Sequence, residues 1–227
     1  SGDYLLFIDD DTVLSPSWMS SIVRTFEKDA RIGGVSGPAI IPPKYKSQRD
    51  LFKHAWIKCI YDWLFLDGKQ HLPGHITPAG AWTTGASEDT CKYEGEVHFL
   101  EACNMAWRKE AFVSVGGFDE RYRGIGDWSE PDLAFRVRKR GWALVFTSDA
   151  WLYHLPDRTG AYLSRQQTGA RYTNYLRFCK RWVKPCVRNE LYKLFLRTYF
   201  LWKEGCNLWA TVCWWKKNRL SRTINTL

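Results

Sequence analysis

The sequence predicts an α/β fold with a mostly parallel central sheet. Residues 4–8 (YLLFI) are apolar without alternation, which is typical of a strand buried on both faces. The aspartates Asp9, Asp10 and Asp11 follow at once, and Ser15-Pro16 predicts a helix start with Ser15 as N-cap. The three acids are therefore expected at the carboxyl end of a buried strand, where ligands bind in open α/β sheets.

The rest of the chain supplies further elements of such a sheet. In the helix expected to begin at Ser15-Pro16, apolar residues recur at helical spacing from Trp18 to Phe26 and should face the sheet. The remaining expected elements are strands at 34–41, 142–146 and 151–154, helices at 51–66, 108–115, 129–140 and about 164–183, a Gly/Pro/Thr-rich loop at 67–85 and a mobile acidic loop at 88–96. At the helix that begins at 129, Ser129 is the expected N-cap and Asp132 the capping-box acid, and Ser164 with Gln167 predicts the cap of the next helix.

Three adjacent carboxylates repel one another and are costly to bury without a partner. A hard divalent cation with oxygen ligands, commonly shared with a phosphate, relieves that repulsion. The residues alone leave a second interpretation open, in which Asp9–Asp11 form a solvated acidic turn.

The net charge of +9 over 227 residues is concentrated at one end of the chain. From Arg177 onward there are twelve Lys/Arg and two Asp/Glu, whereas the first 176 residues carry 21 basic and 22 acidic residues. We therefore expect a near-neutral globular domain at 1–183 and a basic, aromatic-rich helical tail at 184–227. Because the charge belongs to the tail, we do not expect the domain to bind nucleic acid.

The seven cysteines are odd in number and include no C-x-x-C pair, which argues against a zinc site and against a disulfide framework. A reducing, cytoplasmic setting fits best. Neither a signal peptide nor an apolar run near the ~20 residues of a membrane span is visible in the sequence. Lys/Arg interleaved with Trp in the tail has two interpretations. Packing of the aromatics onto the domain is preferred slightly over peripheral contact of the tail with a membrane surface.

Five segments, in this order and spacing, resemble the family 2 glycosyltransferases, which have the Rossmann-like A-type glycosyltransferase fold. They are GDYLLFIDDD at 2–11, CNMAWRKEAF at 103–112, GGFDE at 116–120, EPDLAFRVRKRG at 130–141 and YH at 153–154. The resemblance covers about residues 2–182. In this family the strands that bind the nucleotide base precede the acidic strand, so we expect the chain to be the C-terminal part of a catalytic domain cut from a longer protein.

The resemblance implies ligands for the acidic turn. Asp9 and Asp11 look like the family's D-x-D pair, so that Asp9, Asp10 and Asp11 would bind a nucleoside-diphosphate sugar and Asp9 and Asp11 would hold Mn²⁺ or Mg²⁺. His154 matches a position that approaches the metal or the diphosphate, with a structural histidine as the alternative. Asn104 is grouped with the donor-binding residues, but together with Gly116-Gly117 it is expected to be chiefly structural and to shape the acceptor side.

The resemblance also implies a general base. Glu130 occupies the position of the acid that deprotonates the acceptor hydroxyl in an inverting transfer. Because family members more often show adjacent Glu-Asp than the Glu130-Pro131-Asp132 of this chain, Asp132 is a second candidate. For both acids the alternative is a first-turn carboxylate that complements the helix dipole.

The Q-x-x-R-W signature of processive synthases is missing, so transfer of a single sugar to a glycan, lipid-linked or protein acceptor is expected. Two other functions compete with this one. A metal-dependent nucleotidyltransferase or phosphohydrolase would also use clustered aspartates, and a membrane-surface or nucleic-acid binding module would use the tail.

Overall fold

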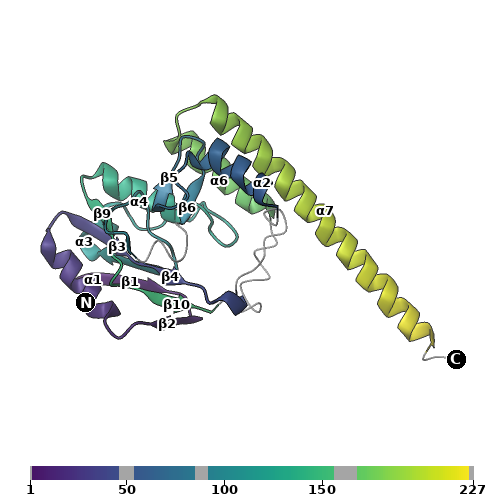
Figure 1. Cartoon of the computed structure of the whole chain (residues 1–227), viewed down its shortest axis with the longest axis horizontal. Coiled ribbons are helices and arrows are strands. Elements are labelled where there is room, and N and C mark those ends of the chain that lie inside the picture. Colours follow the sequence, from purple (N-terminus) through teal and green to yellow (C-terminus); the bar gives the residue numbers. More distant parts are fainter. Residues whose placement is uncertain (1, 46–53, 85–91, 156–167, 225–227) are drawn as a thin grey trace.

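A computed structural model of the chain describes residues 2–45, 54–84, 92–155 and 168–224. Its central sheet has five strands in the order β1-β8-β3-β9-β7 (Figure 1). They are β1 (Tyr4–Ile8), β8 (Asn104–Arg108), β3 (Ile32–Ser36), β9 (Ala143–Phe146) and β7 (Gly95–Glu96). The predicted α/β class is confirmed.

Within this sheet β3 and β9 are parallel, while β1–β8, β8–β3 and β9–β7 are antiparallel. The sheet is therefore mixed, and the expectation of a mostly parallel sheet was wrong in this respect. The reason is that β8 returns from a long excursion and inserts in the reverse direction between β1 and β3. An apolar run indicates that a strand is buried, but it does not indicate the direction of the neighbouring strand.

β1 is an edge strand in the described part of the chain, since β8 is its one partner there. Its residues Tyr4 to Phe7 are half-buried and Ile8 is 46% exposed. Burial on both faces was therefore a wrong expectation for this strand, although its apolar residues still pack against α1 and α3 side chains in two core clusters.

The chain also forms a second, smaller sheet of three strands. It has the order β2-β10-β4, with β10 (Leu152–His154) antiparallel to β2 (Thr12–Leu14) and parallel to β4 (Ala39–Ile40). The predicted strand at 34–41 is thus broken into β3 and β4. The break falls at Gly37, where an added Cβ would overlap the carbonyl group of Ala150, so a residue without a side chain is needed.

The helices begin close to the expected places but with different caps. They are α1 (Trp18–Lys28), α2 (Ala55–Tyr61) with a π-helical turn η3 (Asp62–Leu66), α3 (Lys109–Ser114), α4 (Ser129–Lys139), α6 (Thr168–Trp182) and α7 (Val187–Ile224), with a 3₁₀ turn η1 (Pro43–Tyr45). Ser17, not Ser15, is the N-cap of α1. Ser15 instead donates its N–H to the carbonyl of Trp151, the residue directly before β10, at 3.2 Å.

The segment at 67–85 is more ordered than the predicted loop, because β5 (Pro73–Ile76) and β6 (Trp82–Thr84) form an antiparallel hairpin within it. Its turn is closed by the Gly80 N–H on the Thr77 carbonyl at 2.8 Å. The first part of the acidic loop predicted at 88–96, the beginning of the helix predicted at 51–66 and the Ser164/Gln167 cap lie outside the described residues.

Three apolar clusters build the core. One lies between α1 and the sheet, a second between the sheet and α3 and α4, and a third joins α6, the first turns of α7, η3 and the β5–β6 hairpin. Beyond this third cluster α7 extends away from the other elements (Figure 1). Among the described residues, no helix is both long and apolar enough to cross a membrane.

Asn104, at the start of β8, joins elements that are far apart in sequence. Its side chain is fully buried, accepts a hydrogen bond from Trp18 Nε1 at 2.8 Å and donates to the carbonyl groups of Pro38 and Ala150 at 3.3 and 2.8 Å. The Ser36 hydroxyl donates to its backbone carbonyl at 2.7 Å. The Asn104 side chain thus connects β8 to α1, to the segment between β3 and β4, and to the segment that precedes β10.

We predict that Asn104→Ala lowers the free energy of unfolding by about 3 kcal/mol, because the buried Trp18 N–H and two buried carbonyls would lose a partner. Urea denaturation measures this, with Ser20→Ala, an exposed hydroxyl of α1, as the control expected within about 0.5 kcal/mol of wild type. Unchanged stability together with weaker nucleotide binding would instead support the donor contact predicted from the sequence.

Candidate active site

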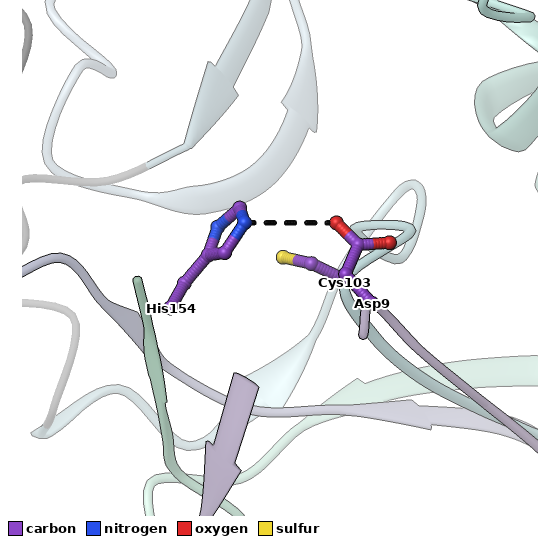
Figure 2. A group of neighbouring side chains, drawn as sticks. All are labelled: Asp9, Cys103 and His154. Carbon is purple, nitrogen blue, oxygen red and sulfur yellow. Dashed lines mark ion pairs between the residues drawn. The ribbon is translucent and has the colours of Figure 1, made fainter. Parts of the chain in front are cut away.

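The strand pairings bring the predicted metal ligands together. β1 and β8 pair with Ile8 opposite Asn104, so Asp9, just after β1, lies beside Cys103, just before β8. β10 pairs with β2 with His154 opposite Thr12, and the Leu155 N–H donates to the Asp11 carbonyl at 2.9 Å. These two registers place His154 against the acidic turn, as Figure 2 shows for Asp9, Cys103 and His154.

The three aspartates differ in their burial and in their distance from His154. His154 Nε2 lies 3.1 Å from Asp11 Oδ1 and 3.7 Å from Asp9 Oδ2. Both carboxylates are partly buried, whereas Asp10 is exposed. The Asp9 backbone is fixed as well, because its carbonyl accepts a hydrogen bond from the Thr12 hydroxyl at 2.7 Å. The structure therefore groups Asp9, Asp11 and His154, and leaves Asp10 on the surface of the turn.

Cys103 is a member of this group that sequence reasoning missed. One ligand atom each of Asp9, Cys103 and His154 lie within 4.8 Å of one another, so the three residues could hold a metal ion. The cysteine spacing had argued against a zinc site, but spacing rules find ligands that are close in sequence, and these come from three separate segments. Burial, with the nearby carboxylates of Glu101 and Asp9, raises the pKa of the Cys103 thiol.

The donor set fits a divalent cation. Carboxylate oxygens and an imidazole nitrogen are ligands of Mn²⁺, and carboxylate oxygens are also ligands of Mg²⁺. The carboxylates of Asp9 and Asp11 lie close to a partly buried histidine, and Asp9 also lies close to a buried thiol. This arrangement concentrates negative charge where a cation would lower the electrostatic energy.

Glu130 lies in the first turn of α4, and its carboxyl group has a raised pKa. Loss of hydration on burial, followed by repulsion from Asp127 and Asp9, raises the pKa of Glu130 from 4.5 to about 7. Glu101, beside Cys103, has its pKa raised to about 7 by burial. A carboxyl group with a pKa near neutrality can exchange a proton in either direction at physiological pH.

Asp132, the other acid of this turn, faces a different environment. Its side chain is fully buried and accepts hydrogen bonds from Arg136 Nε at 2.8 Å, Arg181 at 3.1 Å and Trp182 Nε1 at 2.7 Å. The expected capping box was wrong, because the N-cap of α4 is Trp128 and no side-chain cap is formed. Since Arg181 and Trp182 belong to the end of α6, Asp132 connects α4 to α6.

Comparison with known proteins gives the following relatives. The chain is 28% identical over 163 residues to N-acetylglucosaminyl-diphospho-decaprenol L-rhamnosyltransferase of Mycobacterium tuberculosis, covering 70% of this chain and 49% of that protein. It is 29% identical over 160 residues to the O-antigen biosynthesis protein RfbC of Myxococcus xanthus, covering 68% of this chain and 11% of that protein. The chain thus spans about half the length of the first relative. No protein-family model matches it.

The solved structure of GalNAc-T7 with UDP, GalNAc and Mn²⁺ superimposes with a TM-score of 0.52 at 14% identity, over 80% of this chain and 32% of that one. The chain has the A-type glycosyltransferase fold. The A-type glycosyltransferase fold predicted from the sequence is confirmed.

The loop that leads into α4 is held in place by residues that the sequence analysis did not identify. Trp128 has a positive φ of 75°, uncommon for a bulky residue, and its buried ring lies 4.3 Å from the ring of Trp82 between centroids. Asn174 of α6 pairs with the Arg123 backbone in both directions, at 3.1 and 2.9 Å, and Arg171 forms an ion pair with Asp127. Together, α6 and Trp82 hold the backbone that presents Glu130.

Two glycines of the segment at 123–128 (RGIGDW) could have indicated this loop from the sequence. Gly124 and Gly126 both have positive φ, which glycine adopts without strain. The partners of the loop could not be read from the sequence, because Asn174 and Arg171 lie more than forty residues further along the chain.

We predict that Asp132→Asn destabilises the protein by about 3 kcal/mol, because it leaves buried guanidinium charge without its carboxylate. This loss exceeds the roughly 1 kcal/mol expected of a lost cap. The matched control is Asp149→Asn, since Asp149 forms an exposed pair with Arg24 at 4.0 Å and its loss should change stability by less than about 0.5 kcal/mol. Denaturant unfolding of both variants measures these changes. Equally small losses of stability in the two variants would contradict the anchoring role of Asp132.

Proposed function

We propose that the chain is the catalytic part of a family 2 glycosyltransferase that transfers one sugar from a nucleoside-diphosphate sugar to an acceptor hydroxyl. The observation that carries the proposal is the Asp9–Asp11–His154 group, together with Glu130 in the first turn of α4, whose pKa burial raises to about 7. Relatives named as glycosyltransferases and the shared fold support it.

In this proposal Asp9, Asp11 and His154 hold Mn²⁺ or Mg²⁺ together with the diphosphate of the donor. The cation would neutralise charge on the leaving diphosphate, which makes departure easier. The UDP and Mn²⁺ in the GalNAc-T7 complex support this choice of ligands. Cys103 lies against the same group and would limit the space on its inner side.

Glu130 is the general base in this proposal. The acceptor oxygen attacks the anomeric carbon, the bond from that carbon to the diphosphate oxygen breaks, and the Glu130 carboxylate takes the acceptor proton. A single displacement of this kind inverts the anomeric configuration. Asp132 is not chosen, because three donors already surround it.

The acceptor class and the location form part of the proposal. The Mycobacterium relative is named for a decaprenol-linked substrate, which supports a lipid-linked sugar among the glycan, lipid-linked and protein acceptors expected from the sequence. A cytoplasmic location at a membrane surface would suit such an acceptor. The competing nucleotidyltransferase or phosphohydrolase function has no support from the relatives, which are named for sugar transfer or O-antigen synthesis.

We expect a nucleoside diphosphate to bind the protein at least about tenfold more tightly with Mn²⁺ than in excess chelator, because the cation joins like-charged groups. Calorimetry with UDP and GDP measures this on the chain or on a longer protein that contains it. Asp11→Asn should remove most of the metal effect, while Asp10→Asn, the exposed neighbour, should retain it. Equal affinity with and without metal would contradict the assignment.

Glu130→Gln should lower turnover at least about a hundredfold while the affinity for nucleoside diphosphate stays within about twofold of wild type. Glu110→Gln, an exposed first-turn acid of α3, is the control and should retain full activity. In the unmodified protein, turnover should rise with pH through about 7, since the base acts when deprotonated. An equal loss in both variants would rule out this role for Glu130.

The same substitution should change stability with a defined sign. The folded-state pKa of Glu130, about 7, lies above its ordinary value of 4.5, so the folded protein binds the proton more tightly. The free energy of unfolding of wild type therefore falls as pH rises between these two values. Glu130→Gln removes this dependence, and thermal unfolding should show the variant gaining stability relative to wild type above pH 7 but not below pH 4.5.

A further inference from the structure

Helix α7 is apolar on two opposite faces. Its inner face places Tyr192, Leu196 and Phe200 in the cluster around α6. At about 100° per residue, a second row of apolar residues lies on the opposite side, and we call it the outer face of α7. It consists of Val187, Leu191, Leu194, Leu201 and Trp202, which are 76, 42, 59, 58 and 52% exposed.

Helix α2 with its π-helical turn adds a second exposed apolar surface next to this one. Trp56, Ile60 and Trp63 recur at the spacing of one helix face and are 65, 51 and 69% exposed. On the other side of α2, the rings of Tyr61 and Tyr192 lie 6.2 Å apart, and those of Tyr61 and Phe195 lie 5.5 Å apart. α2 and α7 are therefore neighbours, as seen in Figure 1.

The two surfaces hold most of the exposed large apolar side chains in the described part of the chain. Eight of the fifteen such residues lie on them. Exposed apolar residues are normal when scattered singly, but a concentration of this kind marks an interaction surface.

The charge of α7 indicates what covers the surface. Between Val187 and Ile224 the sequence of the helix contains Glu190 and Glu204 as its acids, against eight bases: Arg188, Lys193, Arg197, Lys203, Lys216, Lys217, Arg219 and Arg222. Arg197 is exposed beside the outer face. Such a helix attracts an anionic surface and repels a second copy of itself.

We propose that the outer face of α7 and the Trp56–Trp63 face of α2 dock on the headgroup region of an anionic membrane. Tryptophan side chains suit this region because one part is apolar and the indole N–H remains hydrated. Leucine side chains enter the acyl boundary, and Lys/Arg side chains pair with lipid phosphates. The docking does not depend on sugar transfer, so it stands or falls apart from the proposed function.

Vesicle flotation of the full chain tests the proposal. Binding should be strong to vesicles that contain phosphatidylglycerol, at least about tenfold weaker to phosphatidylcholine alone, and reduced by salt. Leu194→Glu and Trp63→Glu should each weaken binding about tenfold, because each places a carboxylate at the lipid surface. Val113→Glu is the matched control: Val113 is 61% exposed on α3, and its substitution should leave binding unchanged.

Circular dichroism of each variant confirms that the helices are intact. The proposal is overturned if the chain does not float with anionic vesicles, or if Leu194→Glu and Trp63→Glu bind as wild type does. A chain that is dimeric by sedimentation, becomes monomeric on Leu194→Glu and ignores vesicles would show that a second copy covers the face instead.

Discussion

The buried amide of Asn104 is the contact on which the arrangement of the site depends. It hydrogen-bonds the indole of Trp18 and the carbonyls of Pro38 and Ala150, which belong to three separate segments. The β1–β8 register then places Asp9 beside Cys103, and the passage from Ala150 into β10 brings His154 to the same place. A hydrogen-bonding group without solvent access has to be satisfied by protein, so this connection is specific as well as stabilising.

The site contains several acidic groups, and each of them has different neighbours. Asp9 and Asp11 face His154, whereas burial shifts the pKa of Glu130 and Glu101 to about 7. Asp132, two residues from Glu130, is held by Arg136, Arg181 and Trp182. Two acids in one helical turn thus have different environments, because residues two apart on a helix point in different directions.

The parts that could be read from the sequence are those governed by local patterns. The apolar run at Tyr4–Ile8, the helix over Trp18–Lys28 and the strand at Ala143–Phe146 follow from periodicity and length, and all three form close to the expected bounds. The caps predicted at Ser15 and Ser129 were wrong, because the N-cap positions fall at Ser17 and Trp128 and neither forms a side-chain cap. Trp151 engages the Ser15 N–H, and the left-handed Trp128 takes the N-cap position of α4.

The sequence by itself determined the α/β class, the acidic turn after β1 and the position of Glu130 at a helix start, because each depends on residues within a few positions of one another. Strand direction, the place of Cys103 beside the expected ligands Asp9 and His154, and the anchoring of Asp132 by α6 were decided only by tertiary structure. These features join segments about fifty or more residues apart. No local pattern records which distant backbone or side chain satisfies a buried polar group, and that pairing is settled only when the elements pack.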